Sequence, residues 1–135
     1  MASRIERLNP TTLPDTSALG YSQVSVAPSG RLAFVSGQVA IPADGSAPPV
    51  DFAEQARLAA SNARKALDAL GASAADIVLA RVYVVNLNDQ RMTALMPALQ
   101  ELFANQRPSL TGIGVAALAS PELQIEIELT VSVPA

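Results

Sequence analysis

The sequence predicts an α+β fold in which two helices cover one face of a mixed β-sheet. Apolar residues recur at steps of three and four over residues 51–70, the pattern of a helix with one buried side. Residues 77–85 are β-branched and almost wholly apolar, which indicates a strand covered on both faces. Residues 123–133 alternate between apolar and polar without interruption, as in a half-buried strand.

The first part of the chain carries strand and turn signals. Short strands are expected at residues 22–26 and 32–36, joined as a hairpin by the turn Pro28-Ser29-Gly30. Gly37 is expected to end the second of these strands, and residues 41–50 have the composition of a surface loop. The whole chain then has the order strand, strand, helix, strand, helix, strand, strand, with room for one further strand near the N-terminus.

The helix at residues 51–70 has recognisable ends. Asp51 can accept a hydrogen bond from the amide of Glu54, and Glu54 can reach back, as in a capping box. Gly71 follows as a left-handed residue that closes the helix. The apolar stripe is rich in alanine, so this helix should lie close to the sheet; it consists of Phe52, Ala56, Ala59, Ala63, Leu67 and Leu70.

A second helix is expected from Asn88 or Asp89 to about Ala104. Its inward side would carry Met92, Leu95, Met96, Leu99, Leu102 and Phe103. Pro97 falls inside this range, where a proline costs about 3 kcal/mol, so the regular helix should begin near it or bend there. A strand at 111–118 and a turn at Ser120-Pro121 complete the order of elements.

Composition excludes several classes of function. Half of the residues are hydrophobic and 16% are charged, against about 25% in average domains, which excludes intrinsic disorder. A net charge of −3 gives no basic surface for nucleic acid. Cysteine and histidine are absent, so no thiolate nucleophile, Ser-His-Asp triad or usual zinc site is available. No metal and no cofactor are expected, and any catalysis would use carboxylates, hydroxyls, guanidinium groups, backbone amides and water.

The same features predict location and assembly. The first ten residues lack the apolar core of a signal peptide, and no run of about 18 apolar residues exists, so a cytoplasmic protein without a membrane partner is expected. The length suits one domain over residues 1–135. Few charges on a small domain leave apolar surface exposed, which favours a homo-oligomer.

Taken in order, several segments resemble the YjgF/RidA family, the reactive intermediate deaminases, over nearly the whole chain. They are Gly20-Tyr21-Ser22-Gln23, Phe34-Val35-Ser36-Gly37-Gln38, residues 56–71, Asp76-Ile77-Val78, residues 82–89, Pro108 and Ile125-Glu126-Ile127-Glu128. The resemblance implies a chorismate-mutase-like subunit, a homotrimer whose sheets line a central β-barrel, and three clefts between subunits. Active members hydrolyse enamines or imines released by pyridoxal-phosphate enzymes to keto acids and ammonia, without a cofactor.

Four positions match the cleft residues that this resemblance implies. Tyr21 and the backbone of Ser36-Gly37 would shape the cleft around a small-molecule ligand. The carboxylate at Glu126 would orient the hydrolytic water, which makes Glu126 the candidate catalytic residue.

Three other positions depart from the family pattern. Active members carry an arginine two residues after Pro108, where a guanidinium grips the substrate carboxylate; this chain has Leu110. Gly112 replaces a small or thiol-bearing residue, and Ala94 aligns with a common asparagine. Arg107 is three residues from Leu110, and an odd offset along an extended chain directs it to the opposite face, so it would replace the lost arginine only if the geometry of the loop brought it back.

These observations support three hypotheses. The leading hypothesis is a RidA-like homotrimer that binds a small, mainly apolar or weakly polar metabolite in its clefts and is not an efficient deaminase of amino-acid-derived imines. The alternative is a cofactor-free hydrolase that uses water activated by Glu126 on an imine, enamine, amide or carbamate without a carboxylate. The third is a protein-interaction scaffold with closed clefts. Outside the site, Arg81 is expected to pair with a carboxylate, Glu128 to serve packing or assembly, and Lys65 to be solvated.

Overall fold

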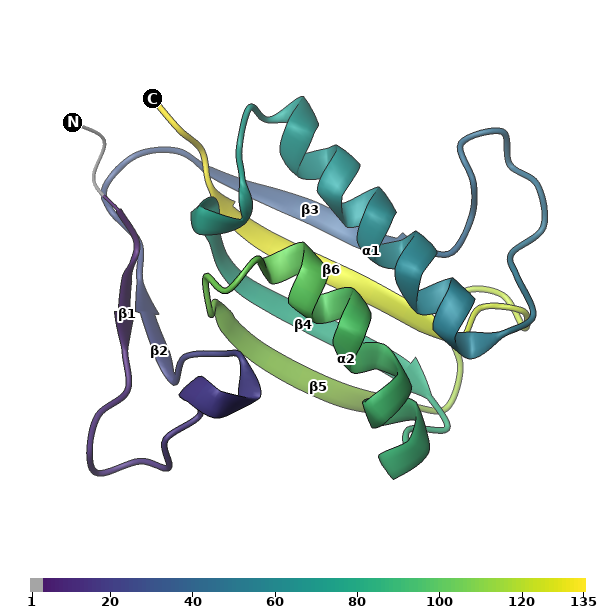
Figure 1. Cartoon of the computed structure of the whole chain (residues 1–135). Helices are drawn as coiled ribbons and strands as arrows, with labels where there is room; N and C mark the ends of the chain where they lie inside the picture. Colours follow the sequence, from purple (N-terminus) through teal and green to yellow (C-terminus); the bar gives the residue numbers. More distant parts are fainter. Residues whose placement is uncertain (1–3) are drawn as a thin grey trace.

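The computed structural model describes residues 4–135 and confirms the predicted α+β architecture (Figure 1). Two helices lie on one face of a four-stranded sheet with the strand order β3-β6-β4-β5. β4 and β5 run parallel, and the other neighbours run antiparallel. The bounds are β3 Leu32–Val39, α1 Phe52–Ala69, β4 Ile77–Val85, α2 Asp89–Phe103, β5 Ser109–Val115 and β6 Ile125–Ser132, with 3₁₀ turns η1 at Ser17–Leu19 and η2 at Ala74–Asp76.

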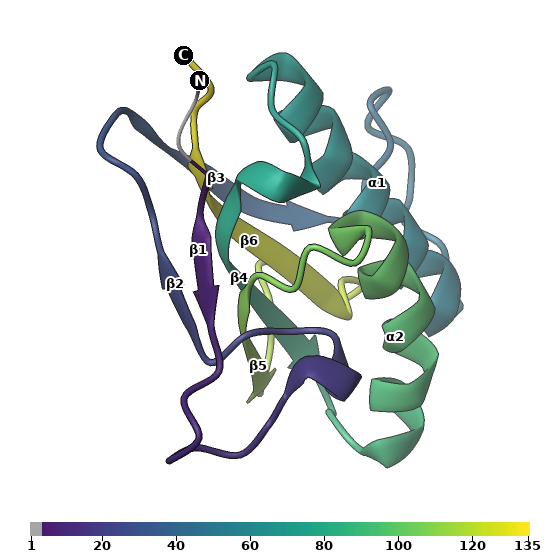
Figure 2. The ribbon, with the colours of Figure 1, turned by 60° about the vertical axis from the view of Figure 1, so that its left-hand side comes forward.

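The expected hairpin across Pro28-Ser29-Gly30 is wrong. β2 (Val24–Val26) pairs with β1 (Glu6–Leu8), and β3 pairs with β6 from the other end of the chain. The turn residues reverse the chain as expected, but a turn signal does not specify which strand becomes the partner. The β1–β2 ribbon lies on the side of the sheet away from the helices, beside the beginning of β5 (Figure 2).

α1 has the predicted ends, although residues 4–135 contain only one of the two hydrogen bonds of the expected capping box. The Asp51 carboxylate accepts a hydrogen bond from the Glu54 amide at 3.0 Å. Gly71 has φ +65°, and the amide of Ala72 donates to the carbonyl of Leu67 at 2.9 Å, which closes the helix. The alanine stripe is fully buried against the sheet, with 0% exposure at Ala56, Ala59 and Ala63.

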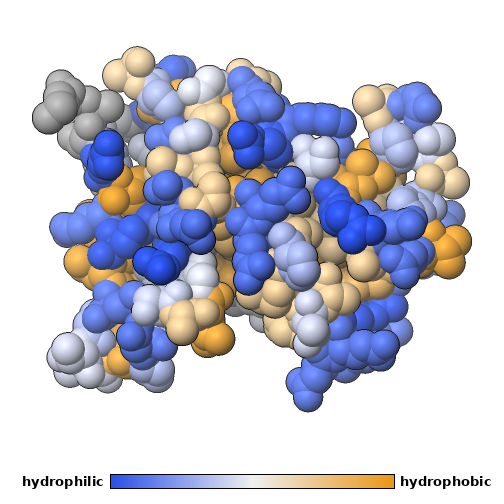
Figure 3. Space-filling view, viewed as in Figure 1, coloured by the Kyte–Doolittle hydropathy of each residue, from blue (hydrophilic) through white to orange (hydrophobic). Residues whose placement is uncertain are grey.

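α2 starts at its expected cap and does not begin near Pro97. The Asn88 side chain accepts a hydrogen bond from the Arg91 amide at 2.8 Å, and the helix continues through Pro97 to Phe103. Pro97 and Thr93, whose carbonyl loses its helical partner, are both exposed, so water can satisfy that group. Neither this helix nor any other in residues 4–135 has the length and apolar character needed to cross a bilayer. On the helix side of the molecule, strongly hydrophobic residues form small groups between hydrophilic ones (Figure 3).

The two faces of the sheet differ in what covers them. The face toward the helices forms the core, which includes Ile77, Ala80, Val82, Val84, Ile125, Ile127, Leu129 and Val131. The other face, called here the open face, carries the side chains that alternate with these, such as exposed Arg81 and half-buried Glu128. β4 is therefore covered on one face, and the expectation that both of its faces are covered is wrong for the single chain.

β3 does not end at Gly37 but continues to Val39 with a bulge. Val35 pairs with Leu129 and Gln38 with Ile127, so Ser36 and Gly37 together oppose the single residue between those partners. A Cβ on Gly37 would meet the Glu126 carboxylate at 2.3 Å. Glycine is needed here for the close approach of that carboxylate, which the sequence pattern alone did not distinguish from a strand end.

Candidate functional site

A cavity of about 430 Å³ opens between α2, η1 and the β5 edge of the sheet. None of its lining residues carries a formal charge, and we call it the apolar hollow. It is lined by Leu19, Tyr21, Val82, Val84, Leu87, Met92, Leu95, Met96, Leu99, Leu110 and Gly112. Three of the predicted cleft residues, Tyr21, Leu110 and Gly112, are thus brought together.

The sequence of β5 explains why this space is open. Leu110 pairs with Ala80, and Gly112 and Gly114 pair with Val82 and Val84, so all three β5 residues lie on the helix side of the sheet. Gly112 supplies no side chain to fill the gap beneath α2, whereas the space over Gly114 is taken by Leu87, 3.3 Å from where a Cβ would stand. A Cβ on Gly112 would meet only the Met92 methyl, at 3.9 Å, so the backbone leaves room for a ligand there.

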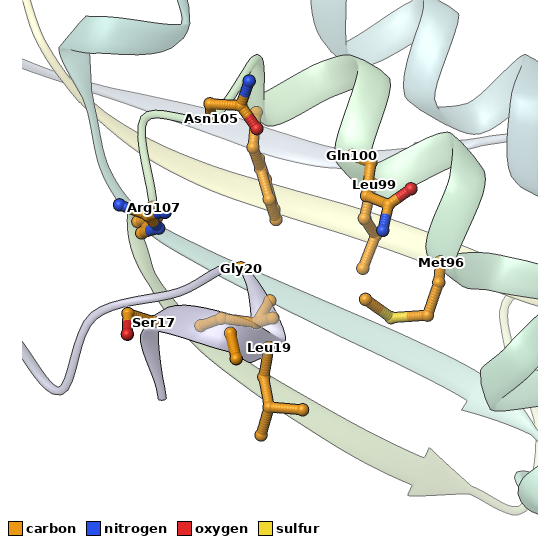
Figure 4. A pocket seen from close by; sticks show the side chains of 11 residues that line it. Ser17, Leu19, Gly20, Met96, Leu99, Gln100, Asn105 and Arg107 are labelled. Atoms are coloured by element: carbon orange, nitrogen blue, oxygen red, sulfur yellow. The ribbon is translucent and has the colours of Figure 1, made fainter. Parts of the chain in front are cut away.

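A second cavity of about 530 Å³ adjoins the apolar hollow and shares Leu19, Met96, Leu99 and Leu110 with it. We call it the Arg107 hollow, because Arg107 is its one charged lining residue; the others are Ser17, Ala18, Gly20, Gln100, Phe103 and Asn105. Figure 4 shows Arg107 and Ser17 at one end and Met96 at the other. The two cavities together form a depression with a charged end and an apolar end.

The expectation that Arg107 points away from Leu110 is wrong, because both residues line this second cavity. The alternation argument assumed an extended chain, whereas Arg107 has φ +52°. Ala104 and Asn105 are also left-handed, at +47° and +62°, so the segment before β5 is a compact turn. Consecutive left-handed residues of this kind leave no reliable signal in an amino-acid sequence.

The other predicted cleft residues lie elsewhere in the chain. Glu126 and Gly37 are in contact on the open face, and Ser36 borders a shallow depression there with Arg81 and Glu128. The sheet separates this group from Leu110. Ala94 is half-buried on α2 and lines neither hollow.

A charged cluster next to Glu126 confirms the expected pairing of Arg81. Its guanidinium lies 3.1 Å from Glu128 Oε1, and the Tyr83 hydroxyl donates to the same oxygen at 3.2 Å. Desolvation by burial, and then the hydrogen bond to Glu128, raise the pKa of Tyr83 above its ordinary value. Residues 4–135 contain no group of three acidic side chains placed to hold a metal ion.

Leu19 and Met96 line both hollows, but the sequence did not single them out. Leu19 lies in a segment that has the composition of a loop, and the structure forms a 3₁₀ turn there with Leu19 59% exposed. An apolar residue directly before the Gly20-Tyr21 pair was the available signal. Met96 was placed on the inward side of α2, which the structure confirms, although Met92 on the same side is 39% exposed at the mouth of the apolar hollow.

Comparison with known proteins gives one consistent result. A family model described as Endoribonuclease L-PSP matches residues 13–133. The RutC family protein YjgH of Escherichia coli is 36% identical over 100 residues, covering 73% of this chain and 75% of that protein. The 2-iminobutanoate/2-iminopropanoate deaminase of Capra hircus is 29% identical over 129 residues, covering 95% and 90%. The crystal structure of the Rid-family protein YyfB from Yersinia pestis has a TM-score of 0.87 and 32% identity, covering 96% of this chain and 99% of that one.

Proposed function

Because the chain belongs to the YjgF/RidA family, we propose that it is an oligomeric small-molecule-binding protein whose ligand enters the apolar hollow. Its relationship to reactive intermediate deaminases is distant in sequence, at 29% and 32% identity to two of them. One domain, residues 1–135, would form each subunit of a homotrimer. The observation that carries the proposal is the uncharged lining of the apolar hollow around Tyr21, Leu110 and Gly112.

Leu110 determines which ligands this hollow favours. The resemblance implies an arginine at this position in enzymes that act on imino acids, and a guanidinium binds a carboxylate through two parallel hydrogen bonds. The Leu110 side chain packs against the hydrophobic core and offers no such bond. A buried guanidinium–carboxylate contact is worth roughly 2–5 kcal/mol, so short imino acids should be poor substrates.

A cleft between subunits would reunite the two separated groups of residues. Tyr21, Leu110 and Gly112 lie on the helix side, whereas Gly37 and Glu126 lie on the open face. Within residues 4–135 the β1–β2 ribbon covers only one end of the open face, and Phe34 is 77% exposed there, so packing against a second copy would bury it. Three copies joined in this way would form the central barrel that the resemblance implies.

Hydrolysis of 2-iminobutanoate, generated in situ by an amino-acid dehydratase, tests this proposal. The 2-iminobutanoate/2-iminopropanoate deaminase of Escherichia coli serves as the reference. We expect the wild-type chain to be at least about 100-fold slower than the reference, given the lost contact. Leu110→Arg should raise the rate by about tenfold or more, and Leu110→Met, which keeps the volume without the charge, should not. A wild-type rate equal to the reference would overturn the proposal.

Glu126 supports a second candidate, hydrolysis of a neutral imine, enamine, amide or carbamate. Its carboxylate lies over the Cα of Gly37 and accepts no hydrogen bond from another side chain in residues 4–135. It is therefore free to bind and orient a water molecule. Glu126→Gln should abolish turnover of such a substrate while leaving thermal unfolding unchanged. Equal rates for the two proteins would reject this candidate and leave the binding function.

A further inference from the structure

Arg107 is the one cation on the wall of the combined depression, and its backbone is held firmly in place. The buried Ser22 hydroxyl donates to the Arg107 carbonyl at 2.6 Å, and the Ser22 amide donates to the Pro108 carbonyl at 3.2 Å. Ser22 also forms a bridge with Ser109 at the start of β5. These bonds hold the backbone of Arg107 in its left-handed conformation, so its side chain starts from a fixed position at the edge of the Arg107 hollow.

The Arg107 guanidinium is available to a ligand. It is exposed, and it forms no ion pair with a carboxylate in residues 4–135, where the two ion pairs use Arg64 and Arg81. The charge of Arg107 acts on Asp15, whose pKa is lowered by hydrogen bonds from Ser17 and, to a smaller extent, by that charge. Asp15 accepts bonds from the Ser17 amide at 3.0 Å and from its hydroxyl at 2.7 Å. The Asp15 carboxylate is therefore already bound to Ser17, and its effect is only to weaken the positive electrostatic potential at Arg107.

The arrangement of charge around the depression defines a ligand class. Arg107 lies at one end with Ser17, and the shared residues Leu19, Met96, Leu99 and Leu110 lead from there to the uncharged apolar hollow. A small imino acid has its carboxylate next to the reacting carbon and no apolar part to span this path. A carboxylic acid with a longer apolar chain satisfies both ends.

We propose that Arg107 binds the carboxylate of an amphipathic acid whose apolar chain lies in the apolar hollow. The inference rests on the proposed function, because it requires that the hollow take a ligand, and it extends that function from neutral molecules to tailed acids. Ser22 is a positioning residue, since it acts on the ligand only through Arg107. The family pattern implies a carboxylate-binding arginine at position 110, whereas this assignment gives that role to Arg107, which lines the same cavity as Leu110.

Calorimetric titration of the full chain with octanoate and with 1-octanol tests the inference. The two probes have the same chain length and differ in charge. Arg107→Met keeps an unbranched side chain without the charge, and Arg64→Met, at an exposed arginine of α1 outside both hollows, is the matched control. We expect Arg107→Met to weaken octanoate binding by about 10- to 100-fold, the range for hydrogen bonds to a charged group. Its affinity for 1-octanol, and the affinity of Arg64→Met for both probes, should change less than about threefold.

Two further variants test the surroundings of Arg107. Asp15→Asn keeps an oxygen that can accept both bonds from Ser17 but removes the negative charge, so it should strengthen octanoate binding by about two- to fivefold at low salt. Ser22→Ala removes the bond to the Arg107 carbonyl and should weaken octanoate binding without changing 1-octanol binding. A merely structural role for Ser22 would weaken both probes equally.

The outcomes separate this inference from the proposed function. If the wild-type chain binds 1-octanol and octanoate equally and Arg107→Met changes neither, the assignment of Arg107 is wrong while the hollow still binds ligands. If the wild-type chain binds neither probe, the proposed ligand site itself fails and the inference fails with it. Octanoate binding that is weakened in Arg107→Met but not in Arg64→Met supports both the inference and the proposed function.

Discussion

The helix-covered face and the open face of the same sheet follow different rules of composition. On the covered face, β4 and β6 present buried aliphatic side chains against α1 and α2. On the open face, the alternate residues of the same strands include Arg81, Tyr83, Glu126 and Glu128. Because successive side chains of a strand point to opposite faces, one strand contributes to two surfaces, a buried aliphatic one and an open one that carries charged and polar groups.

The same comparison explains where the covered face contains a cavity. Along β6 every covered position is filled by a branched aliphatic residue, but at the β5 edge Gly112 occupies a covered position and supplies no side chain. Core packing is complete in the centre of the sheet and incomplete at this edge. The hollow is thus a local exception on the face that otherwise serves stability.

Ile127→Ala tests the role of the covered face and should have the largest effect on stability. Ile127 is fully buried at the centre of β6, and truncation of such a residue leaves a cavity that costs about 2–5 kcal/mol. Glu128→Ala, at the next residue and on the open face, should cost no more than about 1 kcal/mol. Chemical denaturation measures both. Similar losses for the two variants would show that the faces do not differ as described.

Phe34→Ser tests whether the open face is an interface. Phe34 is 77% exposed within the chain, so the change should lower the stability of an isolated subunit little. If the open face packs against other copies, the variant should shift the mass measured by light scattering from trimer toward monomer. Val50→Ser, at a loop residue that is 93% exposed, is the control and should leave the mass unchanged. An unchanged mass in Phe34→Ser would exclude this face as the interface.

Sequence patterns predicted the covered face well because burial imposes periodicity. The stripe of α1, its Asp51 cap and the alternation of β6 were all confirmed, since each depends on local spacing. The pairing of Arg81 was also predictable, because a cation within an apolar strand needs a partner. The pairing of the strands was not predictable in this way. β3 pairs with β6 across nearly 100 residues, and only tertiary packing specifies that choice.

Sequence patterns predicted the candidate site less completely than the covered face, because parts of the site depend on tertiary contacts and not on local spacing. Tyr21, Leu110 and Gly112 came together as expected, but Arg107 did not follow the alternation rule, because the rule holds only for extended backbone. Gly37 was identified as a structural glycine, yet its reason is the Glu126 side chain on a neighbouring strand. Both features depend on contacts that local sequence does not encode.

Loss of the ion pair on the open face should have a smaller effect than either Ile127→Ala or Phe34→Ser. Arg81 and Glu128 are 48% and 38% exposed, and exposed pairs of this kind contribute about 0.2–1 kcal/mol. A double-mutant cycle with Arg81→Met and Glu128→Gln in the Phe34→Ser background measures the coupling without any contribution from packing of other copies through Phe34. The coupling should shrink at high salt. A value that stays constant as salt increases would indicate that the pair is shielded from solvent.

Tyr83 gives the smallest expected effect and a pH dependence of known sign. Desolvation and the hydrogen bond to Glu128 raise its pKa in the folded chain, so the protonated form is favoured there relative to the unfolded chain. The unfolded state begins to lose this proton near pH 10, before the folded state does, and the stability that Tyr83 contributes therefore falls as the pH rises through that range. Wild type and Tyr83→Phe should differ most in unfolding free energy near neutral pH and converge as the pH rises beyond about 10. A constant difference across this range would mean that the Tyr83 proton does not report on the Glu128 cluster, and the open face would then lack the coupling that distinguishes it from the covered face.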